Sequence, residues 1–205
     1  MISRNFLTKW NAIRYTIYQP IYDVVVKTFG ENRKQSIKHL ELTGSEHILI
    51  SGAGTGLDLD FIPSSCKVSA VDISTGMVNK LKKRAERLEN VEAKVMDGHH
   101  LEYADNTFDA VLLHLILAVI PDPVQALKEA ERVLKPGGKI AIFDKFVATG
   151  TEPSLLRKII NIPVAFLATS VTRNLEAIVS QTNLKIQFQK PAKFNGVFQY
   201  ALLIK

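Results

Sequence analysis

The sequence is poor in cysteine and lacks any long apolar run. A single cysteine, Cys66, among 205 residues excludes an internal disulfide and a zinc site built from several thiolates, and it suits a reducing compartment. The longest apolar runs, 111–120 and 159–171, are interrupted by His114 and Asn161, and both fall short of the roughly 20 residues of a transmembrane helix. The first residues lack the continuous apolar stretch of a secretory signal. We therefore expect a cytoplasmic protein, peripheral at most at a membrane.

Acidic residues are scarce in the first 40 positions, which hold seven lysines and arginines but only two carboxylates. Most of the net charge of +6 is therefore N-terminal. Apolar side chains such as Phe6 and Trp10 lie between these charges. This pattern predicts either a region that lies on an anionic membrane surface or a solvated helix packed on the domain. We expect residues 1–40 to form a basic helical region that packs on or caps the active site, and residues 41–205 to form one domain.

Beyond residue 40, short apolar runs alternate with amphipathic stretches, which is typical of parallel strands joined by crossover helices. Predicted strands occupy 47–51, 67–72, 91–96, 108–117 and 139–143. We expect helices after the glycine-rich turn, after Ser74 and from Pro123 to the Pro-Gly-Gly at 136–138. After a helix near 173–182, runs 184–190 and 197–204 predict an antiparallel hairpin. The sequence therefore predicts an α/β fold with a mostly parallel sheet and helices on both faces.

Three glycines in five residues, Gly52, Gly54 and Gly56, follow the first buried strand. Glycines let the backbone approach a ligand closely, and free amides at a helix start favour a polar or anionic group. Leu57 stands where the dinucleotide fingerprint requires glycine, and no phosphate-gripping lysine follows. This segment predicts a nucleotide-type cofactor site, with a simple tight turn as the alternative.

Carboxylates follow the second and third predicted strands. Asp72 ends the strand 67–72, and Asp97 comes directly after 91–96. The carboxyl ends of parallel strands share the edge at which open α/β sheets bind ligands. Taken alone, Asp72 is equally well explained as the residue that caps the following helix. Together with the glycine turn, however, Asp72 is suited to the two hydroxyls of an adenosine ribose and Asp97 to an adenine amino group.

These segments resemble those of the class I S-adenosylmethionine-dependent methyltransferases over about residues 15–205. The resemblance is carried by Gly52-Ala53-Gly54-Thr55-Gly56, Val71-Asp72-Ile73-Ser74, Met96-Asp97-Gly98, Asn106-Thr107-Phe108-Asp109 and Arg132-Val133-Leu134-Lys135-Pro136-Gly137-Gly138. It implies a Rossmann-like seven-stranded sheet and S-adenosyl-L-methionine as cofactor. Its implied contacts are Gly52, Ala53, Gly54, Thr55 and Gly56 for the methionine part, Asp72 for ribose, Asp97 for adenine, and Ile73, Met77, Gly98 and His99 around the adenosine. Ile50 departs from the family, which usually has an acidic residue there.

A finer resemblance points to the branch that includes bacterial phospholipid N-methyltransferases and quinone-biosynthesis C-methyltransferases. It is carried by segments at 18–23, 54–59, 119–123, 143–146 and 172–174. It implies a small-molecule or lipid acceptor, with a phospholipid amine preferred and a quinone-type or other small acceptor next. A protein that binds S-adenosylmethionine without catalysis is the competing hypothesis.

Methyl transfer is an in-line displacement that needs alignment and exclusion of water more than a strong acid. An amine acceptor must lose its proton, so a nearby histidine, carboxylate or tyrosine is useful. The candidate catalytic residues are Tyr22, His114 and Asp144, and the candidate substrate residues are Tyr18, Tyr22, His114, Asp144 and Lys145. The alternatives are a core role for His114, pairing of Asp144 with Lys145 or capping of the next segment by Asp144, and packing roles for both tyrosines.

Three further features of the sequence indicate which lipid, metal or nucleic-acid partners to expect. The apolar and basic insertion at about 146–171 predicts a lid or a lipid-facing helix broken at Pro163, or else a helix that covers the sheet edge. His99-His100 lacks carboxylates at ligand spacing, so we expect no metal. The sequence has no Asn-Pro-Pro-Tyr tetrad and no basic groove interleaved with aromatics, which argues against a nucleic-acid substrate.

Overall fold

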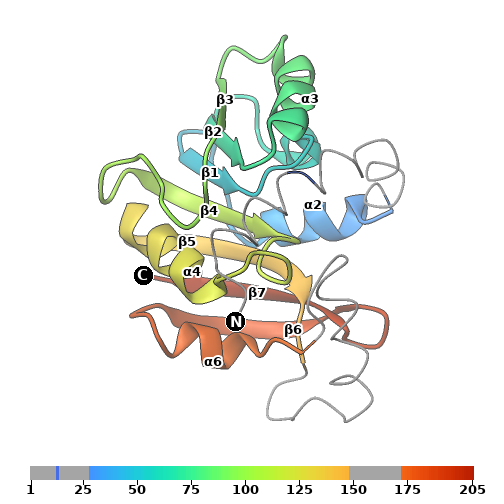
Figure 1. Ribbon diagram of the computed structural model, residues 1–205, viewed down its shortest axis with the longest axis vertical. Coiled ribbons are helices and arrows are strands. Elements are labelled where there is room, and N and C mark those ends of the chain that lie inside the picture. The colour runs from blue at the N-terminus through green and yellow to red at the C-terminus, as the bar shows by residue number, and fades with distance from the viewer. Residues whose placement is uncertain (1–12, 14–27, 148–171) are drawn as a thin grey trace.

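The computed structural model describes residues 13, 28–147 and 172–205 and contains one seven-stranded sheet, drawn in Figure 1. Its strand order is β3-β2-β1-β4-β5-β7-β6. Strands β1 to β5 pair in parallel, and β7 runs antiparallel to both β5 and β6. The strands are β1 (His47–Ser51), β2 (Lys67–Asp72), β3 (Val91–Val95), β4 (Phe108–His114), β5 (Leu134–Lys145), β6 (Lys185–Lys193) and β7 (Phe198–Ile204). The predicted mostly parallel sheet with a C-terminal antiparallel hairpin is confirmed.

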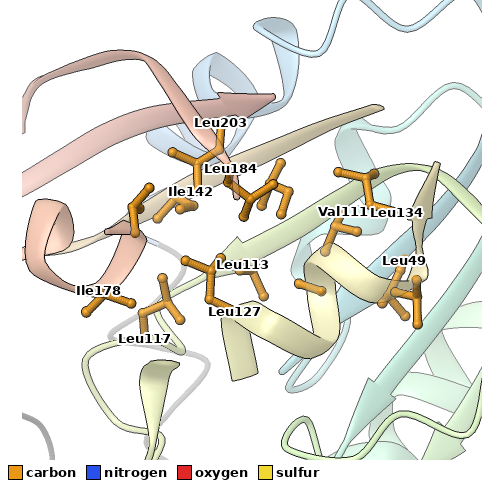
Figure 2. Packing of buried hydrophobic residues seen from close by; sticks show 14 of the residues in the cluster. Leu49, Val111, Leu113, Leu117, Leu127, Leu134, Ile142, Ile178, Leu184 and Leu203 are labelled. Atoms are coloured by element: carbon orange, nitrogen blue, oxygen red, sulfur yellow. The ribbon is translucent and has the colours of Figure 1, made fainter. Parts of the chain in front are cut away.

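Helices cover both faces of this sheet, as expected (Figure 1). On one face, side chains of α2 (Gly30–Lys38), the 3-10 helix η1 (Leu57–Phe61) and α3 (Thr75–Ala85) share a core with Ile48, Ile50 and Leu112. On the other face, α4 (Pro123–Val133) and α6 (Leu175–Val179) pack on Leu49, Val111 and Ile142 (Figure 2). Because successive strand residues point to opposite faces, one continuous apolar strand supplies both cores.

Local sequence signals explain where three helices begin. The side chains of Ser74, Asp122 and Asn174 each accept a hydrogen bond from a backbone N–H three residues later, at 3.3, 3.0 and 2.9 Å. Such caps satisfy amides that have no partner inside the helix. The buried residues of α3 recur at helical spacing, Met77, Val78, Leu81 and Ala85, which turns one stripe of the helix toward the sheet.

The structure corrects three predicted boundaries. The glycine turn opens a five-residue 3-10 helix and not a regular α-helix. β4 ends at His114 and not at 117, because Leu115 turns the backbone to a φ of 59°. α4 ends at Val133, before the Pro-Gly-Gly. These residues instead form the irregular start of β5, where Phe108 pairs with Leu134 but Ala110 pairs with Lys139.

Several expectations concern parts of the chain outside the described residues. Tyr18, Tyr22 and most of the insertion at 146–171 belong to them, and the proposed division at residue 40 remains a prediction. Within the described ranges, no helix is long and apolar enough to cross a membrane. The same ranges contain no group of three or more histidine, cysteine, aspartate or glutamate side chains suited to a metal ion.

Candidate functional site

The glycine turn after β1 requires glycine for both conformation and space. Gly52, Gly54 and Gly56 have φ values of 76°, 56° and 82°, in the left-handed region that side chains disfavour. A Cβ on Gly52 would lie 2.7 Å from Ile116, and one on Gly56 would lie 2.4 Å from Leu81 of α3. The amides of Gly52 and Ala53 both donate to the carbonyl of Val71 at 2.9 Å, which ties the turn to the end of β2.

Asp72 joins this turn to the start of α3. Its Oδ2 accepts from the amide of Gly54, and its Oδ1 accepts from the amide of Ser74, both at 2.9 Å. Burial raises the pKa of the carboxyl, while these two hydrogen bonds act in the opposite direction. A carboxylate offers about four acceptor positions. The two amides therefore fix the orientation of Asp72 and leave capacity for a pair of ligand hydroxyls.

Asp97 is oriented by its neighbour His99. The Oδ1 of Asp97 accepts from the amide of His99 at 2.9 Å and lies 2.7 Å from its Nδ1. The Nε2 of His99 accepts from the amide of Asp122 at 3.2 Å, so its proton sits on Nδ1 and is donated to Asp97. His99 is buried. It thereby links the loop after β3 to the start of α4.

The remaining cofactor candidates differ in exposure. A Cβ on Gly98 would lie 3.0 Å from the Oγ of Ser51, so the loop after β3 approaches the end of β1 closely. Ile73 is half-buried, whereas Met77 is 1% exposed and belongs to the core. Ala53 and Thr55 are also buried. The structure thus gathers the glycine turn, Asp72 and Asp97 at the carboxyl edge of the sheet, whereas Met77 is buried in the first turn of α3.

His114, the last residue of β4, lies inside a buried polar network on the α2 face. Its Nδ1 is 2.7 Å from Oδ1 of Asp58, and its Nε2 is 2.9 Å from the hydroxyl of Ser36. The Oδ2 of Asp58 accepts from Arg33 at 2.7 Å. The side chains of Arg33, Asp58 and His114 are 5%, 2% and 0% exposed. Both ring nitrogens of His114 therefore have protein partners.

Asp144, near the end of β5, lies on a different face of the sheet from His114. Phe143, the register partner of His114, packs on the α2 face, so Asp144 points to the α4 face. Asp144 accepts from the amides of Ala118 and Lys145, both at 2.8 Å. Burial raises the pKa of Asp144 and lowers that of Lys145. His114 and Asp144, which we expected to act at one point, thus lie on opposite faces.

Arg173 is a partly buried cation that interacts electrostatically with Asp144. Burial lowers the pKa of Arg173 to about 10, while Asp144 and Asp122 oppose that shift. Its guanidinium donates to the carbonyl of Leu117. The loop after β4, the end of β5 and the start of α6 are thereby connected beside the candidate acceptor residues.

Sequence reasoning missed three of these charged residues, Arg33, Asp58 and Arg173. Arg33 belongs to the basic N-terminal stretch that we interpreted only through its net charge. Asp58 follows the glycine turn by two residues, and that position was the one available signal. Arg173 lies in segment 172–174, which carries part of the finer family resemblance but has no other signal of a role. A hollow of about 320 Å³ between α2 and β6, lined in part by Lys38, His39 and Phe188, involves none of the candidate site residues.

Two segments of the family resemblance prove to be structural. Asp109 accepts from the amide of His47 at 2.9 Å and pairs with Lys135 at 2.6 Å, at the amino edge of the sheet. Arg132 donates to the carbonyls of Leu101 and Tyr103, both at 2.8 Å. These residues hold the edge opposite the candidate site and do not face it.

Comparison with known proteins agrees with this geometry. A family described as "Methyltransferase domain" matches residues 49–142, which include the glycine turn and both carboxylates. A phosphatidylethanolamine N-methyltransferase of Cereibacter sphaeroides is 27% identical over 184 residues, which cover 88% of this chain and 90% of that protein. A demethylmenaquinone methyltransferase of Corynebacterium urealyticum is 37% identical over 127 residues, covering 59% of this chain and 53% of that protein.

Solved structures share the fold at low sequence identity. The [4+2]-cyclase SpnF superposes with a TM-score of 0.79 at 16% identity, over 96% of this chain and 95% of the other. A geranyl diphosphate methyltransferase in complex with S-adenosylmethionine gives 0.69 at 16% identity, over 85% and 83%.

Proposed function

We propose that this protein, a class I S-adenosylmethionine-dependent methyltransferase, transfers its methyl group to the amine nitrogen of a phospholipid headgroup. One observation carries the choice of acceptor. The relative named phosphatidylethanolamine N-methyltransferase aligns along 88% of this chain and 90% of its own length, so the likeness extends beyond the cofactor-binding half.

The residues at the carboxyl edge fit the adenosyl cofactor. Asp72 is positioned by two backbone amides and would accept from the ribose hydroxyls. Asp97, held by His99, would accept from the adenine amino group. The backbone of residues 52–56, freed of side chains at three positions, would approach the methionine part. When bound, S-adenosylmethionine supplies a methyl carbon on a positively charged sulfur, which a lone pair displaces in line.

An amine acceptor needs a group that takes its proton. Both nitrogens of His114 are engaged, by Asp58 and by Ser36. Asp144 accepts from two amides, but a carboxylate keeps further acceptor positions. Burial raises its pKa, which makes it a better proton acceptor than an exposed carboxylate. We therefore assign Asp144 to proton removal and His114 to holding the end of β4. Tyr18 and Tyr22 stay candidates for closing over the acceptor.

A second acceptor class has its own support. The demethylmenaquinone methyltransferase shares a higher identity, 37%, although the alignment reaches only 53% of that protein. The chain thus spans about half of the quinone-type relative. A carbon acceptor of that class would need proton removal from a ring hydroxyl, a task that Asp144 would also serve.

The deciding experiment offers both acceptors to the purified protein. S-adenosylmethionine labelled in its methyl group is incubated with vesicles that contain phosphatidylethanolamine, or with dispersed demethylmenaquinone that dithionite has reduced to its hydroquinone. Lipid products are separated by mass. We expect monomethylated and further methylated phosphatidylethanolamine. Methylated quinone with unmodified phosphatidylethanolamine would transfer the assignment to the second class. The variant Asp72→Ala serves as the control without a functional cofactor site.

A further inference from the structure

The tip of the β6–β7 hairpin exposes a phenylalanine in a conformation that phenylalanine disfavours. Phe194 is 61% exposed, the largest value among the exposed large apolar side chains of the described residues. Phe194 and Asn195 have φ values of 51° and 50°, and Gly196 follows at 83°. The amide of Val197 donates to the carbonyl of Phe194 at 3.1 Å and closes the turn. Glycine or asparagine suits such a position better. The ring lies 5.8 Å from that of Phe198, centre to centre, and this contact leaves most of it in solvent.

One lysine lies beside the exposed ring, and a second lies farther back on the same strand. The Nζ of Lys193 donates to the carbonyl of Thr28 at 3.1 Å and lies 5.4 Å from the centre of the Phe194 ring and 4.8 Å from that of Phe29. Lys190 is exposed, with its Nζ 4.8 Å from the ring of Phe188. No aspartate or glutamate follows Glu176 in the chain. The hairpin therefore carries positive charge only.

This tip lies at the same edge of the sheet as the candidate site. Phe198 pairs with both Lys145, at the carboxyl end of β5, and Lys193, at the end of β6. The amide of Phe146 donates to the carbonyl of Val197 at 3.2 Å. In Figure 1, the arrowheads of β4 and β5 point toward the side on which the β6–β7 turn lies. An acceptor that enters at this edge would pass beside the hairpin.

We propose that the β6–β7 hairpin, through Phe194 at its tip and Lys190 and Lys193 of β6, contacts the anionic surface of a phospholipid bilayer. The inference rests on the proposed function, because a headgroup amine is presented at such a surface. An aromatic ring at headgroup level with lysines reaching lipid phosphates is the arrangement that interfaces favour. A stable protein partner would need roughly 800 Å² on each side, much more than one exposed ring provides.

The test measures sedimentation of the full chain with vesicles of phosphatidylcholine alone or with added phosphatidylglycerol. Phe194→Asn suits the left-handed turn, so loss of folding is not expected. We expect Phe194→Asn to weaken binding to anionic vesicles about fivefold. The double variant Lys190→Gln with Lys193→Gln should weaken binding by about fivefold for each lysine removed. The matched control is Lys185→Gln, because Lys185 begins β6 at the opposite edge and is exposed. It should bind within about twofold of the original chain.

Two outcomes would overturn the proposal. One is vesicle binding that is absent in the original chain or unchanged in Phe194→Asn and the double lysine variant. The other is a concentration-dependent dimer that Phe194→Asn abolishes, which would assign the tip to a second copy. Calorimetric binding of S-adenosylmethionine should be equal in all variants. Hairpin-dependent vesicle binding without methylated phosphatidylethanolamine would refute the proposed acceptor and leave the contact surface intact.

Discussion

The carboxylate of Asp58 lies 2.7 Å from Nδ1 of His114, although 56 positions separate the two residues in sequence. Its other oxygen accepts from Arg33 of α2 at 2.7 Å. Burial by itself would raise the pKa of Asp58, but Arg33 and His114 hold it well below its ordinary value. This network joins α2, the helix after the glycine turn and the end of β4 into one unit beside the cofactor edge.

Removing the charge of Asp58 should cost much more stability than removing that of its neighbour Asp60. Asp58→Asn leaves Arg33 buried without its counter-charge, which destabilises proteins by about 3–5 kcal/mol. Asp60 is 53% exposed and pairs with Arg84, so Asp60→Asn should cost less than about 1 kcal/mol. Urea unfolding of both variants measures the difference. Equal losses would show that the buried network does not hold the fold together.

Acid should weaken the loop before β1 through Glu46. Its carboxylate accepts from the amide and hydroxyl of Thr43 and from the amide of Gly44, at 2.8, 2.7 and 2.9 Å. Burial opposes ionisation, but these hydrogen bonds lower the pKa of Glu46 to about 2. Because the folded pKa is depressed, the stabilisation is complete above the unfolded pKa and is lost as pH falls toward 2.

The variant Glu46→Gln isolates that contribution. We expect its free energy of unfolding to be about 1 kcal/mol lower than that of the original chain at pH 7, and this difference to be smaller at pH 3. Denaturant unfolding at the two pH values measures the gap. A gap that stays constant, or widens in acid, would contradict the hydrogen-bond assignment.

Two glycines with similar backbone angles should respond differently to alanine. Gly56 has a φ of 82° and a Cβ there would meet Leu81 at 2.4 Å, whereas Gly137 has a φ of 76° and nothing within 4 Å. Gly137→Ala should therefore cost about 1 kcal/mol for conformation alone. Gly56→Ala adds overpacking of about 1–3 kcal/mol against α3. Thermal unfolding compares the two, and an equal loss would mean that α3 moves freely to admit the methyl group.

The edge of the sheet that holds the site was predictable because it depends on strand order and strand ends. Runs such as 47–51 and 67–72 are apolar throughout and bounded by turn residues, so their carboxyl ends and Asp72 could be located. The roles of His114 and Asp144 could not be separated in this way. A strand end does not reveal which face its last side chain takes, and the observed bend at Leu115 sets the end of β4.

Long-range pairing was equally invisible in sequence. Arg33 looked like one of many surface cations, and only the fold places it beside Asp58. The Pro-Gly-Gly at 136–138 is a common helix ending, yet α4 stops at Val133. The amide of Gly137 donates to the carbonyl of Lys205 at 3.1 Å, and the amide of Lys205 donates to Gly138 at 3.2 Å. Pairing with the distant C-terminus therefore takes these glycines into the sheet.

We propose that the glycine turn and Asp72 hold S-adenosylmethionine at the carboxyl edge of the sheet. Calorimetric titration of the original chain, Asp72→Ala and Asp60→Asn with S-adenosylmethionine measures whether they do. Loss of two hydrogen bonds to a charged group should weaken binding to Asp72→Ala by about 100-fold or more, while Asp60→Asn should bind like the original chain. Unchanged affinity in a folded Asp72→Ala variant, or no binding to the original chain, would contradict the account.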